Sequence, residues 1–285
     1  METDFITPVE KRGDFYFKRE DVYVPYDFSP ANGSKLRQCQ LLIKKNAEAA
    51  KNGIVTGTSI LSPQAVIAAS VAKQINVPCD IFYGGTRQEL LETKKYPSIA
   101  KKLGANISIV SKMAYTSVLT SKAEEYANTN GRFNIRYGFD LRNNLDVFIG
   151  SVATQTQNIP KEAKILVVTV GSAITLIGIL CGLAMYENNI EKVFAIGCAP
   201  NRINKIQDYA DMIYFERGIV LPVGKLKYID AFNNIKGYKY ENTMKEEYNG
   251  IVFHPRYEAK SFCWLRKQNL SKCLFWITGK DIQPN

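Results

Sequence analysis

A charge-free stretch, residues 165–186, constrains the fold most, because so many uncharged residues in succession have to be buried. It opens with the β-branched run Ile165–Val170, breaks at Gly171-Ser172 and continues with the helix-forming pattern Leu176–Tyr186. About 20 apolar residues can span a bilayer, so a membrane helix is one alternative. The β-branched run and the glycine break instead favour a buried parallel strand, a tight turn and a buried helix.

Strand-like apolar runs and helical patterns alternate along the rest of the chain. The predicted strands cover residues 53–57, 79–83, 107–110, 165–170, 193–197 and 274–279, and predicted helices cover 36–51, 63–74, 88–103 and 176–186. This alternation is typical of parallel βαβ units. We therefore predict an α/β fold of two lobes, with twisted, mainly parallel sheets flanked by helices. Residues 1–40 and 156–285 are expected to form the larger domain, and residues 41–155 a smaller inserted α/β domain.

The charge balance favours anionic partners. Lysine and arginine number 37 against 27 acidic residues, for a formal net charge of +10 and a pI of about 9.2. Basic clusters such as Lys94-Lys95 and Lys101-Lys102 could contact phosphates, although solvated helix faces have the same composition. No zinc-finger spacing or RNA-binding aromatic signature accompanies them. Nucleic acid is therefore retained as a partner that would be bound through charge and shape.

The cysteines and the single histidine argue against disulfide, metal and serine hydrolase chemistry. The six cysteines are scattered singly, which is typical of reduced thiols in a cytoplasmic protein. Residues 1–14 lack the apolar run of a signal peptide. With His254 as the sole histidine and no GxSxG elbow, we expect neither a metal site nor a serine hydrolase triad. His254 is expected to orient the segment Pro255–Glu258.

Two N-terminal segments carry the first resemblance to a known family. They are Phe15–Asp21, which contains Arg19 and Asp21, and Asn32–Arg37, which contains Lys35. Together they resemble the start of the fold-type II pyridoxal-phosphate (PLP) enzymes, of the tryptophan synthase β-like superfamily. The branch they are most similar to is that of D-cysteine desulfhydrase and aminocyclopropane-carboxylate deaminase. The resemblance implies that the cofactor is PLP and that Lys35 is the catalytic lysine, which forms the Schiff base.

The turn after Ile165–Val170 carries the second resemblance. Backbone N–H groups at the start of a helix, with nearby hydroxyls, favour a phosphate dianion. The segment is similar to the family's glycine-rich phosphate loop, which places the loop in the larger, cofactor-binding domain. The cofactor-binding residues implied are Gly171, Ser172, Ala173, Ile174 and Thr175. Ala173 and Ile174 replace glycines of the family, so close approach of the backbone to the phosphate is less favoured.

The segment from His254 to Ser261 carries the third resemblance. It is similar to a proline-x-tyrosine-glutamate-glycine-lysine motif of the deaminase branch. The resemblance implies that Tyr257 is a catalytic and substrate-binding residue and that Glu258 binds the pyridine nitrogen of the cofactor. A carboxylate there would keep the ring nitrogen protonated and deepen the electron sink.

A fourth segment, Gly57–Gln64, resembles the family's loop for the substrate carboxylate. It implies that Ser62 is a catalytic and substrate-binding residue and that Gln64 binds substrate. Pro63 stands where relatives have an asparagine, and it has neither a side-chain donor nor a backbone N–H. A tyrosine that relatives carry before the segment Gly218–Pro222 is also missing. Both departures from the family pattern favour substrates other than ordinary amino acids.

These resemblances extend from Phe15 to Ser261 and imply an enzyme of the PLP-dependent lyase or deaminase class. It would act at Cα or Cβ of an amine-bearing substrate, with a small amino acid as the leading candidate. The amine of Lys35, once displaced by the substrate, would serve as acid or base. One alternative is a decarboxylase or lyase for an amino-acid-modified DNA base, as in phage DNA hypermodification. The other is a binding protein on a decayed enzyme scaffold. We expect a homodimer without membrane attachment, located in the cytoplasm, or in the host cytoplasm if phage-encoded.

Overall fold

The computed structural model describes residues 5–113, 115–140 and 142–283 of the chain. Contacts divide these residues into two units, each with its own parallel sheet. Unit 1 contains residues 24–140 and 282–283, and unit 2 contains residues 5–23 and 142–281. These limits differ from the domain boundaries expected near residues 40 and 155. In particular, the helix that carries Lys35 groups with unit 1.

Unit 1 is built on a four-stranded sheet in which all strands are parallel. The strands, in spatial order, are β5 (Asn106–Ser111), β4 (Cys79–Gly84), β3 (Ile54–Ser59) and β6 (Phe133–Asn134). The helices are α1 (Gly33–Lys45), α2 (Ala47–Ala50), the 3-10 helix η2 (Gln88–Thr93), α3 (Gln64–Gln74), α4 (Lys95–Lys102) and α5 (Thr116–Asn130). The expected alternation of strands and helices is thus confirmed for this part of the chain.

Both faces of the unit 1 sheet are covered by helices, because successive strand residues point to opposite sides. Val55 packs against Ala123 and Ala127 of α5, on one face. On the other face, Thr56 accepts a hydrogen bond from Gln64, the first residue of α3. The strand β3 therefore lies between α5 and α3.

The structure differs from two of the helix predictions in unit 1. The helix expected over residues 36–51 begins earlier, at Gly33, and is interrupted at Asn46. The Asn46 side chain donates to the carbonyl of Leu42 at 2.8 Å, which gives the end of α1 a local hydrogen-bond partner. The region expected to be helical over residues 88–103 divides into η2 and α4, with Lys94 extended between them.

Unit 2 is built on a six-stranded sheet in which one edge strand is antiparallel. Its strands, in spatial order, are β1 (Val9–Arg12), β2 (Phe15–Arg19), β12 (Cys273–Ile277), β7 (Ile165–Val170), β8 (Lys192–Gly197) and β9 (Leu226–Ile229). Only the β1–β2 pair, joined by a turn at Gly13, is antiparallel in this sheet. A small hairpin pairs β10 (Glu247–Tyr248) with β11 (Ile251–Val252).

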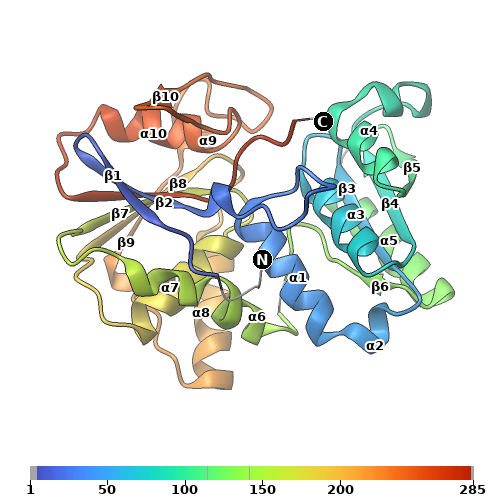
Figure 1. Cartoon of the computed structure of the whole chain (residues 1–285), viewed down its shortest axis with the longest axis horizontal. Helices are drawn as coiled ribbons and strands as arrows, with labels where there is room; N and C mark the ends of the chain where they lie inside the picture. The colour runs from blue at the N-terminus through green and yellow to red at the C-terminus, as the bar shows by residue number, and fades with distance from the viewer. Residues whose placement is uncertain (1–4, 114, 141, 284–285) are drawn as a thin grey trace. The chain divides into compact units, whose positions relative to one another are not determined.

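Helices cover both faces of the unit 2 sheet, as Figure 1 shows with α7 and α8 on one side and α9 and α10 on the other. The helices are α6 (Leu145–Ser151), α7 (Ile174–Met185), α8 (Ile203–Arg217), α9 (Ala231–Asn234) and α10 (Glu258–Arg266), with 3-10 helices η1 (Glu20–Val22), η3 (Ala153–Asn158) and η4 (Val223–Lys225). On the α10 side, Phe17, Phe194 and Phe275 of the sheet pack with Phe262 in one hydrophobic core. This core fixes the start of α10 relative to the sheet.

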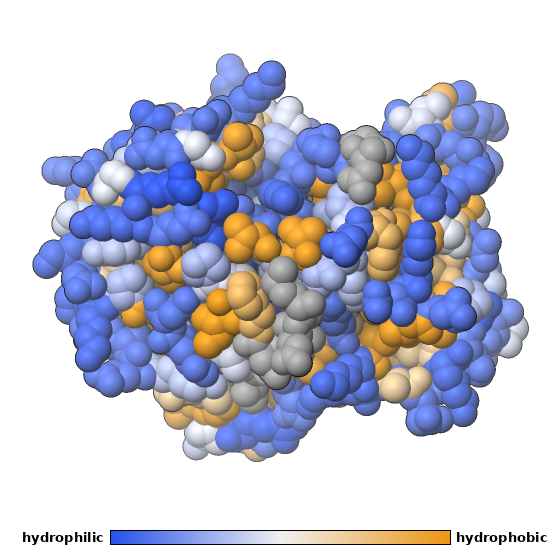
Figure 2. All heavy atoms as spheres, in the orientation of Figure 1, coloured by the Kyte–Doolittle hydropathy of each residue, from blue (hydrophilic) through white to orange (hydrophobic). Residues whose placement is uncertain are grey.

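The charge-free stretch 165–186 forms the predicted strand, turn and helix. It comprises β7, the turn at residues 171–173 and α7, and both elements are largely buried in unit 2. Among the described residues, no helix is both long and apolar enough to cross a membrane. Hydrophilic residues cover most of the face drawn in Figure 2, and hydrophobic residues appear there in small separate groups.

Candidate active site

The turn between β7 and α7 has the backbone geometry of an anion-binding loop. Ala173 is the residue that caps α7, and it adopts the left-handed conformation with φ 70° and ψ −6°. Within the part of the chain that the structure describes, no side chain caps this helix end. Because the first N–H groups of a helix have no partner within the helix, they are available to an anion. A left-handed residue next to helical ones turns successive N–H groups toward one point.

Ala173 keeps a left-handed backbone conformation although it stands where the family loop has a glycine. An alanine replaces a glycine of the family loop, yet its backbone takes the left-handed conformation that glycine adopts most readily. This costs about 1 to 2 kcal/mol, which the packing around it must offset. Ala173, Ile174 and Thr175 are buried, while Gly171 and Ser172 remain half-buried. The loop therefore keeps a left-handed turn despite the substitution.

Tyr257 lies beside the start of this loop. A Cβ atom added at Gly171 would be 3.4 Å from Cε1 of Tyr257, so the ring is in contact distance of the loop backbone. The Tyr257 hydroxyl is 2.8 Å from the hydroxyl of Tyr240. The His254 ring packs edge-on against Tyr257 with centroids 4.7 Å apart, and His254 Nδ1 accepts a hydrogen bond from the Arg256 N–H. These contacts hold the Tyr257 ring next to Gly171.

Glu258, the first residue of α10, is a buried carboxyl. Its Oε1 accepts hydrogen bonds from the N–H and the hydroxyl of Thr278, which follows β12. Burial raises the pKa of Glu258 to about 7, and the hydrogen bonds from Thr278 oppose this effect. A carboxyl in such a setting suits a cationic N–H partner, since a neighbouring positive charge would favour its ionised form.

In unit 1, the predicted cofactor lysine and the predicted substrate loop lie in well-defined surroundings. Lys35 is half-buried in the first turn of α1, with Nζ 5.7 Å from the centre of the Phe139 ring. Ser62 is buried, and its hydroxyl accepts a hydrogen bond from the N–H of Gln64 at 3.3 Å. The Gln64 amide bonds to Thr56 and to the backbone of Arg136 and Gly138. Both ends of this amide are thus engaged within unit 1, and binding of substrate by Ser62 and Gln64 stays a prediction.

The structure brings together some of the predicted residues and describes the others separately. Within unit 2, the loop from Gly171 to Thr175 lies beside Tyr257, and Glu258 follows Tyr257 directly. Within unit 1, Ser62 and Gln64 follow β3, and Lys35 lies on α1. The meeting of both sets at a single cofactor stays a prediction.

Three residues that contact the predicted site residues were not predicted from the sequence. Thr278 holds Glu258, Tyr240 holds Tyr257, and Phe139 lies under the amine of Lys35. Thr278 could have been found, because it follows the strand β12 and ligand sites in parallel sheets form at the carboxyl ends of strands. Tyr240 and Phe139 lie outside the regular helices and strands, where no periodic pattern marks them.

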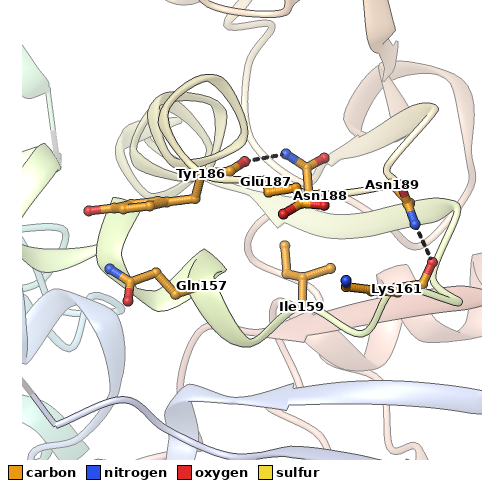
Figure 3. A pocket seen from close by; sticks show the side chains of 7 residues that line it. All are labelled: Gln157, Ile159, Lys161, Tyr186, Glu187, Asn188 and Asn189. Atoms are coloured by element: carbon orange, nitrogen blue, oxygen red, sulfur yellow. Dashed lines mark hydrogen bonds between the residues drawn. The ribbon is translucent and has the colours of Figure 1, made fainter.

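A surface cavity of about 350 Å³ lies elsewhere on unit 2, at the far end of α7 (Figure 3). Its lining residues are Gln157, Ile159, Lys161, Tyr186, Glu187, Asn188 and Asn189. The asparagine amides bond to backbone carbonyls, Asn188 to Tyr186 and Asn189 to Lys161. The whole length of α7, roughly 18 Å, separates this cavity from the loop at Gly171. We therefore do not assign it to the candidate active site.

Comparison with known proteins identifies the fold. No protein-family model matches the chain. The chain is 23% identical to the O-seryl-dTMP PLP-dependent decarboxylase of Salmonella phage ViI, over 99% of this chain and 82% of that protein. The solved structure of an ACC deaminase homologue matches with a TM-score of 0.78 and 20% identity, over 98% of this chain and 90% of that one.

Other solved structures lead to the same conclusion. Threonine deaminase isoform 2 of Solanum lycopersicum matches with a TM-score of 0.65 and 13% identity, over 97% of this chain and 84% of that one. A pyridoxal 5'-phosphate-dependent aspartate racemase matches with a TM-score of 0.60 and 14% identity, over 98% and 91%. The fold expected from the sequence is confirmed, and the chain has the fold of the fold-type II pyridoxal-phosphate enzymes.

Proposed function

We propose that the chain is a PLP-dependent decarboxylase whose substrate is an amino acid joined through its side chain to a pyrimidine nucleotide. The observation that carries the proposal is its similarity, over 99% of its length, to the O-seryl-dTMP decarboxylase of a phage. Pro63 supports the same choice, because it removes the side-chain donor that the family resemblance would lead one to expect near the cofactor. This proposal replaces the free small amino acid as the leading substrate.

The residues described above fit the requirements of PLP. The loop at Gly171 with its left-handed Ala173 would hold the phosphate, and the buried carboxyl of Glu258 would pair with the ring nitrogen. Lys35 would hold the aldehyde carbon covalently. When bound, PLP supplies an electron sink for the carbon that bears the substrate amine.

The reaction balances without an oxidant or a second reactant. A serine joined through its side-chain oxygen keeps both its amine and its carboxylate on Cα. The bond between Cα and the carboxylate breaks, carbon dioxide leaves, and Cα receives a proton, which leaves an aminoethyl ether on the nucleotide. In this scheme Lys35 holds the proton for Cα, and Tyr257 orients the substrate. The pose that aligns the carboxylate for departure is a matter of substrate positioning.

The charge of the chain agrees with an anionic substrate. A net charge of +10 attracts nucleotides, whether free or within a nucleic acid. We propose that nucleic acid binding, if the substrate is polymeric, is mainly electrostatic. A DNA-binding isotherm measured over a salt series tests this, because neutralised phosphates give a steep loss of affinity with salt.

A second candidate is a deaminase or lyase for a free small amino acid. It is favoured by the high TM-score of 0.78 to the ACC deaminase homologue and by the motif around Tyr257 and Glu258. A third candidate, a binding protein without catalysis, would be supported by failure to take up PLP.

The products distinguish the three candidates. Purified protein loaded with PLP is incubated with O-seryl-dTMP, free L-serine, D-cysteine or aminocyclopropane-carboxylate, and the released carbon dioxide and ammonia are measured. The proposal predicts carbon dioxide from O-seryl-dTMP without ammonia, and no product from the Lys35→Ala variant. Ammonia from a free amino acid, with no carbon dioxide from the nucleotide, would establish the second candidate instead.

A further inference from the structure

The loop that follows β6 holds a phenylalanine in an unusual backbone conformation. Phe139 has φ 58° and comes directly after Gly138, which has φ 70°. Bulky residues rarely adopt positive φ, and such positions persist only where their surroundings fix them. The Phe139 side chain is fully buried, and its N–H donates to the carbonyl of Arg136 at 3.0 Å. The conformation therefore belongs to a closed turn rather than to an exposed loop.

Gln64 supplies much of what holds this turn. Its Nε2 donates to the carbonyl of Arg136 at 3.0 Å, and its Oε1 accepts from the N–H of Gly138 at 2.8 Å. Thr56 adds a hydrogen bond from its hydroxyl to the carbonyl of Ile135 at 2.7 Å. A single amide side chain thus bonds to the backbone on both sides of the turn and fixes the residue that precedes Phe139.

The ring held in this way lies close to the amine of Lys35. The distance from Nζ to the ring centre is 5.7 Å, within the range of about 6 Å for a cation–π contact. Lys35 lies in the first turn of α1, where the helix dipole disfavours a cation, and that turn contains no acidic residue. The negative face of the Phe139 ring opposes this effect.

A phenylalanine that only fills the core needs no positive φ and no hydrogen-bonded turn to hold it. We propose that Phe139 is a positioning residue for Lys35: its ring holds the lysine ammonium group whenever that amine is not bound to the cofactor, and Gln64 fixes the ring through the turn. This inference rests on the proposed function, in which Lys35 is the cofactor lysine. It gives Gln64 a role that does not require contact with substrate.

The reactivity of Lys35 in the cofactor-free full chain tests the proposal. Acetic anhydride acylates only uncharged amines, so a ring that stabilises the ammonium form slows the labelling of Lys35. In Phe139→Leu and Phe139→Met, Lys35 should be acylated about 2- to 30-fold faster than in the original protein, by the usual strength of a cation–π contact. Phe139→Tyr keeps an aromatic face and should label at the original rate. Lys44, exposed on the same helix, is the internal reference.

Leucine, methionine and tyrosine at position 139 all place a side chain on a residue with positive φ, so the backbone strain is similar in the three variants. A difference in Lys35 labelling between the aliphatic variants and Phe139→Tyr therefore reports the aromatic ring itself. Thermal unfolding of each variant identifies any that fails to fold, and the remaining aliphatic variant then carries the test. Equal labelling of Lys35 in Phe139→Leu, Phe139→Met and the original protein would overturn the proposal. So would labelling of Phe139→Tyr as fast as that of the aliphatic variants.

A second measurement separates this inference from the proposed function. In the PLP-loaded Phe139→Leu protein, the covalently bound PLP should remain at the original level, while kcat falls and KM is unchanged. Loss of bound PLP in that variant would indicate a structural role and contradict the inference. If the original protein takes up no PLP at Lys35, the proposed function fails, whereas the labelling result for Phe139 stands independently.

Discussion

At the scale of single residues, Glu258 is the group whose protonation links the candidate site to stability. Burial raises its pKa from 4.5 to about 7. The folded chain therefore binds this proton more tightly than the unfolded chain does. The contribution of Glu258 to stability is complete below pH 4.5, decreases as the pH rises toward 7, and is lost above it. The full difference is at most about 3.5 kcal/mol, since one pKa unit corresponds to about 1.4 kcal/mol.

We predict that Glu258→Gln flattens this part of the pH dependence in the cofactor-free protein. A neutral amide has no proton to lose, so the stability of the variant relative to the original protein should rise between pH 5 and pH 8. Urea denaturation at four pH values across this range measures the difference. A stability difference that does not change with pH would contradict the assigned protonation of Glu258.

A second residue-scale prediction concerns the strain at Ala173. Ala173→Gly should stabilise the protein by up to about 1 kcal/mol, because glycine adopts the left-handed conformation without steric cost, although it is more flexible when unfolded. Ala210→Gly, inside α8, is the matched control and should destabilise by about 1 kcal/mol. Urea denaturation of both variants measures their free energies of unfolding. Equal destabilisation by Ala173→Gly and Ala210→Gly would contradict the left-handed conformation of Ala173.

At the scale of elements, α7 packs closely on the segment that contains η3. A Cβ added at Gly178 would come within 2.6 Å of Cβ of Val152, which precedes η3. A Cβ added at Gly182 would likewise be 2.5 Å from the carbonyl oxygen of Ala153. The glycines of α7 are therefore required by close packing rather than by backbone conformation. This packing fixes the helix whose first turn forms the candidate phosphate site.

Gly178→Ala should therefore destabilise the protein by about 1 to 2 kcal/mol, although alanine favours helices more than glycine does. In a Val152→Gly background, where the obstructing Cβ and methyl groups are absent, the same substitution should be neutral or stabilising. A double-mutant cycle of unfolding free energies measures this coupling. Additive effects of the two substitutions would contradict the packing described.

The elements that could be predicted from the sequence are those with a strong local pattern. Ile165–Val170 is β-branched and uncharged, and its strand was predicted with the bounds that the structure has. The break at Asn46 was missed, because it depends on a side chain that bonds to the backbone four residues earlier. Glu258 was identified through a family motif, but its partner Thr278 is distant in sequence. Phe139 was missed because nothing in its local sequence indicates a left-handed turn.

At the scale of the whole molecule, the proposed function draws on residues of both units. Lys35 belongs to unit 1, and the loop at Gly171 and Glu258 belong to unit 2. The proposed chemistry requires all three at the same cofactor.

The most direct test is to locate the covalent attachment. The protein is incubated with PLP, reduced with borohydride and digested, and the pyridoxyl-bearing peptide is identified by mass spectrometry. We expect the label on Lys35, its absence in Lys35→Ala, and its retention in Lys44→Ala, which alters the same helix at its far end. A label on another lysine, or none at all, would contradict this expectation.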